Sequence, residues 1–190
     1  LGAQEASGLE ARVRTTNGVP RIEIDGKPTR SRIFFGNPRG GRIDVGKVPE
    51  VISFEFEAIQ DSGGEATFHF RFGQEPGRCW IDDFHIEEVA TKRAVIGPLT
   101  FENGLTDFEE NWRFWPTGED NTVGKVTVAA AAGGKALQVQ LTKPKKDKWP
   151  DYHIFTLPTL KLTGGKRYRV SFRGWADKER KWSLGCYVPG

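Results

Sequence analysis

Two pairs of carboxylates have the spacing that acid–base catalysis from a β-strand would need. Glu23 and Asp25 form one pair, and Glu55 and Glu57 form the other. Residues i and i+2 of a strand share a face, and a retaining glycosidase holds two carboxyl groups about 5 Å apart. A solvated strand face has the same spacing and is the favoured interpretation of both pairs. Asp25 is followed by Gly-Lys-Pro, so the three-acid pattern Glu-x-Asp-x-x-Glu is not completed.

The histidines His69, His85 and His153 are the other candidates for proton transfer or metal binding. A lyase base or a metal site could use one of them. They fall in different predicted strands, and no two have the close spacing of metal ligands, which favours polar residues on strand faces. No Ser–His–Asp order, phosphate-binding loop or dinucleotide fingerprint accompanies them. We therefore predict no catalytic residue.

Aromatic rings outside the predicted core are difficult to explain, as a group, by packing alone. One face of a pyranose consists of C–H groups and stacks on an indole or phenol ring, while its hydroxyls bind polar side chains. The rings predicted to lie on polar faces or in loops are Trp80, Trp115, Trp149, Tyr152, Trp175 and Tyr187. Their predicted polar partners on a concave face are Glu55, His69, Arg71 and Arg173.

Short stretches of alternating apolar and polar residues must position these side chains. Residues 51–59 place Phe54 and Phe56 on one face, and residues 67–72 repeat the pattern with further phenylalanines. Other predicted strands cover 21–25, 31–35, 43–45, 79–86, 125–128, 136–141, 152–157, 167–176 and 182–188. Short strands along the whole chain, with no helix, predict an all-β jelly roll or β-sandwich of antiparallel strands.

The domain organisation follows from the turns and from a weak internal repeat. Residues 1–10 are predicted to be a flexible lead-in, and residues 11–190 to form the sandwich domain. Residues 51–73 and 169–190 both have the order strand, polar loop, strand and glycine. Two related halves, 11–97 and 98–190, would produce this repeat.

Composition and charge exclude several functional classes. The net charge is +3, from 28 basic and 25 acidic residues that are interspersed along the chain. A nucleic-acid partner is not expected, because such proteins usually carry a clustered basic stripe. The lysine-rich run at 143–148 is interpreted as a solvated loop. No stretch approaches the roughly 20 apolar residues of a membrane span.

Cysteine chemistry is limited to Cys79 and Cys186. Two cysteines cannot complete a structural zinc site. A disulfide in an exported protein and two free thiols both remain open.

Four phrases of the sequence resemble the jelly-roll carbohydrate-binding modules of families 4, 9 and 22. They are Phe-Glu-Asn-Gly at 101–104 running to Trp112, the glycine turn and strand at 133–139, Gly-Lys-Arg-Tyr-Arg-Val-Ser-Phe at 165–172, and Trp-Ile-Asp-Asp-Phe at 80–84. In such modules the motif like residues 101–104 comes first and the motif like residues 80–84 comes last. In this chain the order of the two motifs is reversed. A permuted single sandwich is therefore favoured over two fused modules.

The resemblance implies non-catalytic binding of a polysaccharide, with a β-glycan expected. Residues 18–28 and 33–36 also resemble the start of large bacterial glycoside hydrolases, in which a β domain precedes a barrel. A covalently linked catalytic domain and a secreted, extracellular location are therefore expected. The opening residues 1–8 agree with what remains near a removed signal peptide.

The resembling modules often carry a structural calcium ion, which implies Glu102 and Asp83 as ligands here. Two alternatives to sugar binding stay open. One is a purely structural accessory domain of a glycoside hydrolase, and the other is a catalytic jelly roll, either a polysaccharide lyase or a glycosidase. Rings exposed together on one surface would favour binding, whereas buried tryptophans would favour a spacer.

Overall fold

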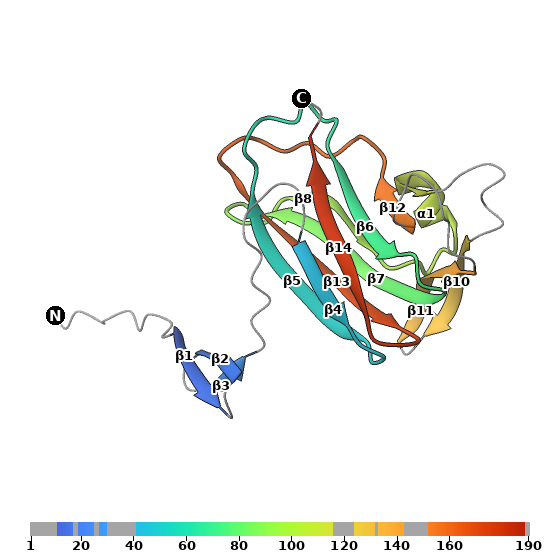
Figure 1. The fold of residues 1–190 in the computed structure, drawn as a ribbon. Helices are drawn as coiled ribbons and strands as arrows, with labels where there is room; N and C mark the ends of the chain where they lie inside the picture. Colours follow the sequence, from blue (N-terminus) through green and yellow to red (C-terminus); the bar gives the residue numbers. More distant parts are fainter. Residues whose placement is uncertain are drawn as a thin grey trace. The chain divides into compact units, whose positions relative to one another are not determined.

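The computed structural model describes residues 11–16, 19–24, 27–29, 41–115, 124–131, 133–142 and 152–188. The chain divides into two compact units, Leu1–Ile33 and Phe34–Gly190. The first unit contains an antiparallel sheet in the order β1 (Ala11–Thr16), β2 (Val19–Ile24) and β3 (Lys27–Thr29) (Figure 1). These strands form a sheet of their own, and the described part of the sandwich begins at Gly41.

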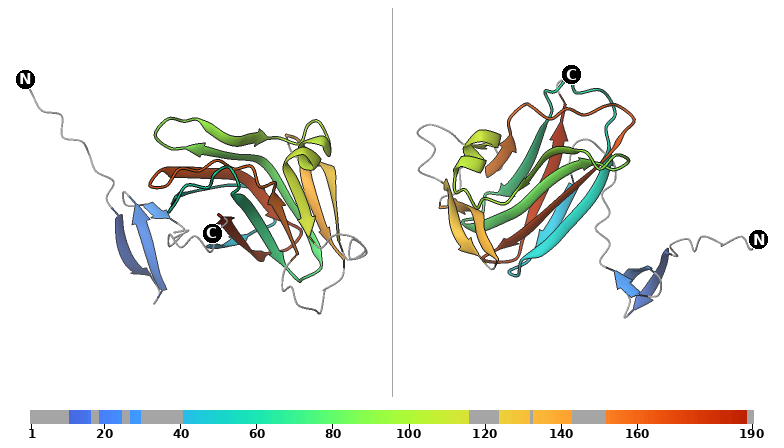
Figure 2. Two further views of the ribbon diagram at one scale, coloured as in Figure 1. Left: turned by 90° about the horizontal axis from the view of Figure 1, so that it is seen from above. Right: turned by 180° about the vertical axis from the view of Figure 1, so that it is seen from behind.

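The second unit is an all-β sandwich of two antiparallel sheets, as the sequence predicts (Figures 1 and 2). The five-stranded sheet has the order β4 (Gly41–Val45), β14 (Arg180–Tyr187), β6 (Thr67–Gly73), β12 (Tyr152–Thr156) and β9 (Trp112–Trp115). The six-stranded sheet has the order β10 (Gly124–Ala131), β11 (Gly134–Leu141), β7 (Gly77–Glu88), β13 (Arg167–Ala176) and β5 (Glu50–Glu57), with β8 (Ala94–Leu99) paired to β7.

The two predicted halves of the chain interleave within each sheet. Strand β13 lies between β7 and β5, and β14 lies between β4 and β6. The sequence repeat therefore does not correspond to two separate half-sandwiches.

Aromatic side chains form the core between the sheets, and strict alternation places them there. Phe68, Phe70 and Phe72 of β6 are buried, and the residues between them are not. The Phe70 ring centre lies 4.9 Å from that of Phe172 on the opposite sheet. A strand with a buried face of this kind fixes its register, because a slip by one residue would expose every phenylalanine. The same alternation turns His69 and Arg71 away from the core.

A short helix, α1 (Thr106–Asn111), was not predicted from the sequence. Its six residues bury only Phe108. A segment this short does not show the apolar repeat that identifies a helix over longer windows. Among the described residues, no helix has the length and apolar character needed to cross a membrane.

Candidate functional site

The outer face of the five-stranded sheet carries a row of side chains that crosses every strand. Register pairs Arg42 with Ser183, Ser183 with Arg71, Arg71 with His153, and His153 with Trp115. Residues opposite each other in antiparallel strands share a face. With strands about 4.8 Å apart, the row extends over about 19 Å. Two charged groups, a hydroxyl, an imidazole and an indole are thus aligned across the sheet.

Beside this row, His69 stacks on two aromatic neighbours from the adjacent strand. Its ring centre is 5.1 Å from that of Phe155, with 16° between the planes, and 5.4 Å from that of His153, with 27°. The Phe155 and His153 ring centres are 5.5 Å apart. Trp115 adjoins the group, with its ring centre 6.5 Å from that of His153. These rings form a continuous aromatic platform on the sheet.

Tyr187 closes the platform on the side of β14. Its ring meets His69 edge-on, with ring centres 4.5 Å apart. The Arg71 guanidinium lies 5.5 Å from the centre of the Tyr187 ring, within the range of a cation–π contact. We call Arg71, His69, His153, Phe155, Trp115 and Tyr187 the platform cluster. Each of its members is partly exposed.

His69 is uncharged at neutral pH. Burial, together with the nearby His153 and Arg71, lowers the pKa of His69 to about 3. Its Nε2 atom lies 2.9 Å from the Thr67 hydroxyl, and its Nδ1 atom is buried without a hydrogen-bond partner among the described residues. The His69 ring therefore acts in this cluster as a neutral, stackable surface.

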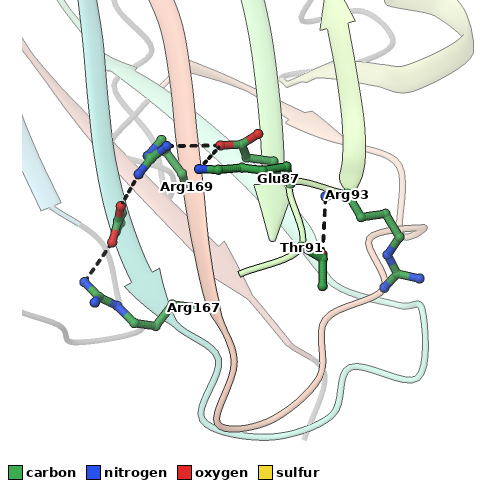
Figure 3. A network of polar contacts seen from close by, with 7 residues as sticks. Glu87, Thr91, Arg93, Arg167 and Arg169 are labelled. Carbon is green, nitrogen blue, oxygen red and sulfur yellow. Dashed lines mark hydrogen bonds and ion pairs between the residues drawn. The ribbon is translucent and has the colours of Figure 1, made fainter. Parts of the chain in front are cut away.

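The outer face of the six-stranded sheet carries a network of ion pairs instead. Arg169 bridges Glu55 at 2.6 Å and Glu87 at 3.1 Å, and Arg167 contacts Glu55 at 2.8 Å (Figure 3). The hydrogen bond from Arg169 is the main cause of the lowered pKa of Glu55. Glu55 therefore belongs to a solvated strand face on a different sheet from His69 and Arg71.

Trp80 and Trp175 form a second aromatic pair, on the same sheet as this ion-pair network. They are directly opposed in the register, and their rings are almost parallel, 3° apart in plane and 5.8 Å between centres. Arg78 lies 5.9 Å from the Trp80 ring centre, and Gln138 is paired with Trp80. Trp175 is only 9% exposed, so the pair presents mainly Trp80 to solvent.

The predicted aromatic set thus separates into several groups. Trp115 and Tyr187 join the platform cluster, whereas Trp80 and Trp175 lie on the other sheet. Tyr152 is buried, with 1% exposure, because it shares the inward face of β12 with Ile154. It cannot stack on a sugar at the surface. Trp149 lies outside the described residues.

The sequence interpretation missed Phe155 and set His153 aside as a simple polar residue. The signal was present in the alternation of β12, where Tyr152, Ile154 and Thr156 are buried. That pattern turns both His153 and Phe155 outward, and only the pairing of β12 with β6 brings them to His69.

The predicted calcium ligands have other partners. The Asp83 carboxylate lies 3.0 Å from Arg173 Nε, and Glu102 Oε1 accepts a hydrogen bond of 2.7 Å from the Lys135 amide. Arg173 also pairs with Asp82, which is buried. No group of three metal-ligating side chains was found among the described residues. The described residues therefore do not supply a complete set of calcium ligands, and calcium binding stays a prediction.

Both cysteines are free thiols. Burial raises the pKa of Cys79 and that of Cys186 to about 12. Both thiols are therefore protonated at neutral pH, and of the two alternatives for these residues the structure shows the free thiols.

No protein-family model matches the chain. Neither a curated protein nor a solved structure is significantly similar to it.

Proposed function

We propose that this chain binds carbohydrate without altering it, through the platform cluster on the five-stranded sheet. The observation that carries the proposal is the gathering of Trp115, His153, Phe155, His69 and Tyr187 into one partly exposed surface. Stacking of sugar C–H faces on such rings supplies affinity, and the flanking polar groups supply hydrogen bonds. The elongated row suits a polysaccharide chain lying across the strands.

The biological role that we propose is the targeting of an attached glycoside hydrolase to its substrate. The resemblance to jelly-roll carbohydrate-binding modules supports this role, and such modules act within larger secreted bacterial enzymes. A purely structural accessory domain is the less favoured alternative, because a spacer has no need for a partly exposed platform of stacked rings.

A catalytic jelly roll is the second candidate, because the cluster combines histidine, tyrosine and arginine. Two observations weigh against it. The pKa of His69, about 3, makes its ring a weak base near neutral pH. Among the described outward-facing residues of this sheet, Asp44 is the one carboxylate. These residues therefore do not include the two carboxylates that a glycosidase requires.

The test is affinity electrophoresis and calorimetry against a panel of polysaccharides. Because an aromatic contact contributes about 1 kcal/mol or more, Trp115→Ala and Phe155→Ala should each weaken binding about tenfold. Trp80→Ala, on the other sheet, is the matched control and should bind like the parent protein. Release of new reducing ends from the polysaccharide would instead support the catalytic candidate.

Two results would overturn the proposal. One is that no polysaccharide of the panel binds. The other is that Trp80→Ala abolishes binding while Trp115→Ala and Phe155→Ala leave it intact. Circular dichroism of each variant shows whether the sandwich has kept its fold.

A further inference from the structure

Strand β10 forms an edge of the six-stranded sheet, at one end of the sandwich (Figure 2). Among the described residues, its one strand neighbour is β11. The two strands pair over eight consecutive positions without a register shift, from Gly124 opposite Leu141 to Ala131 opposite Gly134. Within the described part of the chain, the other side of β10 therefore presents backbone amides and carbonyls with which a further strand can pair.

Strand β10 lacks the features that usually keep an edge strand from pairing with another chain. Such features are proline, a bulge, short length and several charged side chains. The sequence of β10, Gly-Lys-Val-Thr-Val-Ala-Ala-Ala, contains one charged residue and no proline. The strands at the other ends of the two sheets differ: β5 has three glutamates, β4 has five residues of which two are charged, and β9 has four residues. Of these four edges, β10 is therefore the one best suited to pairing.

The inward-facing valines of β10 are incompletely covered. Val126 lies opposite Val139, and Val128 lies opposite Leu137. Val139 and Leu137 are fully buried, whereas both valines of β10 are only partly buried. A strand added beside β10 would cover their exposed edge, and burial of apolar surface is favourable.

A second copy of β10 is complementary to this edge. If two copies run antiparallel about a two-fold axis at Thr127, Val126 of each copy lies opposite Val128 of the other. Lys125 then lies opposite Ala129, so no two lysines face each other. Directly opposed residues share a face, and the four valines therefore meet on the inner side of the sheet. An unrelated peptide would need pockets for its alternate side chains, and the outward-facing Thr127 and Ala129 are too short to form them.

We propose that the chain forms a homodimer in which β10 pairs antiparallel with β10 of a second copy and joins two six-stranded sheets into one. The same strand contributes from both copies, as in other interfaces with two-fold symmetry. The symmetry axis is normal to the joined sheet, because opposed residues of the two copies share a face. Both platform clusters therefore face the same side of the dimer.

One consequence of the dimer rests on the proposed function. If the platform cluster binds a polysaccharide, one long polymer can engage both copies, which strengthens binding without a new contact. The dimer itself does not depend on this, because its formation needs no ligand.

Sedimentation equilibrium of the full chain without ligand tests the dimer, and we expect twice the mass of one chain. Val128→Lys places a charge at the contact and should weaken dimerisation about tenfold or more. In the monomer the stem of this lysine can lie along the edge of the sheet. Val51→Lys is the matched control, since Val51 is an exposed valine on β5, at the other edge of the same sheet, and it should dimerise like the parent protein.

Two results of this experiment would overturn the proposal. One is a parent protein that is monomeric at every concentration up to its solubility limit. The other is that Val51→Lys dissociates the dimer while Val128→Lys leaves it intact. Neither result depends on whether a polysaccharide binds, so failure of the dimer and failure of the proposed function are distinguishable.

Cross-linking tests the register, and it does not require that Val128→Lys folds. Thr127→Cys should form a disulfide between two copies on mild oxidation, because directly opposed residues have Cα atoms within bridging range. The parent protein, which contains Cys79 and Cys186, should stay unlinked, and so should Ser53→Cys on β5. Linking of Ser53→Cys but not of Thr127→Cys would overturn the assignment to β10.

The consequence for binding is tested with the polysaccharide that binds best and with a short oligosaccharide cut from it. Val128→Lys should bind the polymer on the order of a hundredfold more weakly than the parent protein and the oligosaccharide equally well. Equal affinity of both proteins for the polymer would overturn the joint action of the two platform clusters.

Discussion

The ring of Tyr187 packs against the backbone of Gly185, two residues earlier on the same strand. A Cβ atom at Gly185 would lie 3.1 Å from Tyr187 Cε2 and 3.4 Å from the Tyr187 hydroxyl oxygen. A Cβ atom at this position would require the ring to shift by a few tenths of an ångström, and a branched side chain would require more. The missing side chain therefore allows Tyr187 to lie beside His69 and Arg71.

This relationship predicts that Gly185→Val weakens carbohydrate binding as much as Tyr187→Ala does. The valine displaces the ring, and the alanine removes it, so each should cost about tenfold in affinity. Tyr187→Phe keeps the ring and should retain most of the affinity. Calorimetry against the best-binding polysaccharide measures all three variants. Gly185→Val with unchanged affinity would show that the position of the Tyr187 ring does not matter.

His69 should make the stability of the sandwich depend on pH in mildly acidic solution. Its pKa falls from 6.5 to about 3 on folding, so the unfolded chain binds more protons between these values. The free energy of unfolding therefore rises with pH through this window. As the pH falls below about 6.5, it decreases by up to about 1.4 kcal/mol per pH unit.

The substitution His69→Gln removes the titrating imidazole. It should flatten the pH dependence of the free energy of unfolding between pH 5 and about 6.5, a range above the pKa values of most carboxylates. Urea unfolding at a series of pH values provides the comparison with the parent protein. His85→Gln is a control on the other sheet. If His69→Gln and the parent protein have parallel curves, His69 titrates normally in the folded state.

Arg173 should contribute to stability through Asp82. Asp82 is 2% exposed, and burial is the main cause of its raised pKa, which the hydrogen bond from Arg173 opposes. Arg173→Gln leaves this buried carboxylate without its cation and should lower the free energy of unfolding by roughly 2–4 kcal/mol. The double variant Arg173→Gln with Asp82→Asn should recover part of the loss. No recovery in the double variant would mean that the packing of Arg173, and not its charge, stabilises this region.

Calcium and Arg173 would compete for Asp83. If Glu102 and Asp83 hold calcium, as the resemblance implies, adding the ion to chelator-treated protein should raise the melting temperature by ligand linkage. The rise should be larger in Arg173→Gln, because the guanidinium no longer occupies Asp83. Glu102→Gln should reduce it. A melting temperature that calcium leaves unchanged in both the parent protein and Arg173→Gln would show that the prediction of calcium binding is wrong.

The face of each side chain was predictable from local alternation. Phe68, Phe70 and Phe72 turned out to be inward, and His69 and Arg71 outward, because successive residues of a strand point to opposite sides. The end of β13 departs from this rule. A register shift between Ser171 and Arg173 and the stacking on Trp80 leave Trp175 almost buried on what the sequence predicts to be a polar face.

Sequence alone determined that this chain forms an antiparallel β-sandwich with an aromatic core, since period-two patterning and turn residues are local properties. Only the tertiary structure decided which strands are neighbours. It placed Arg71 of β6 between His153 and Ser183, and it placed Glu55 on the other sheet. Strand pairing joins segments that are far apart in the chain, and the packing of the whole core selects which segments pair. No single stretch of sequence contains that information.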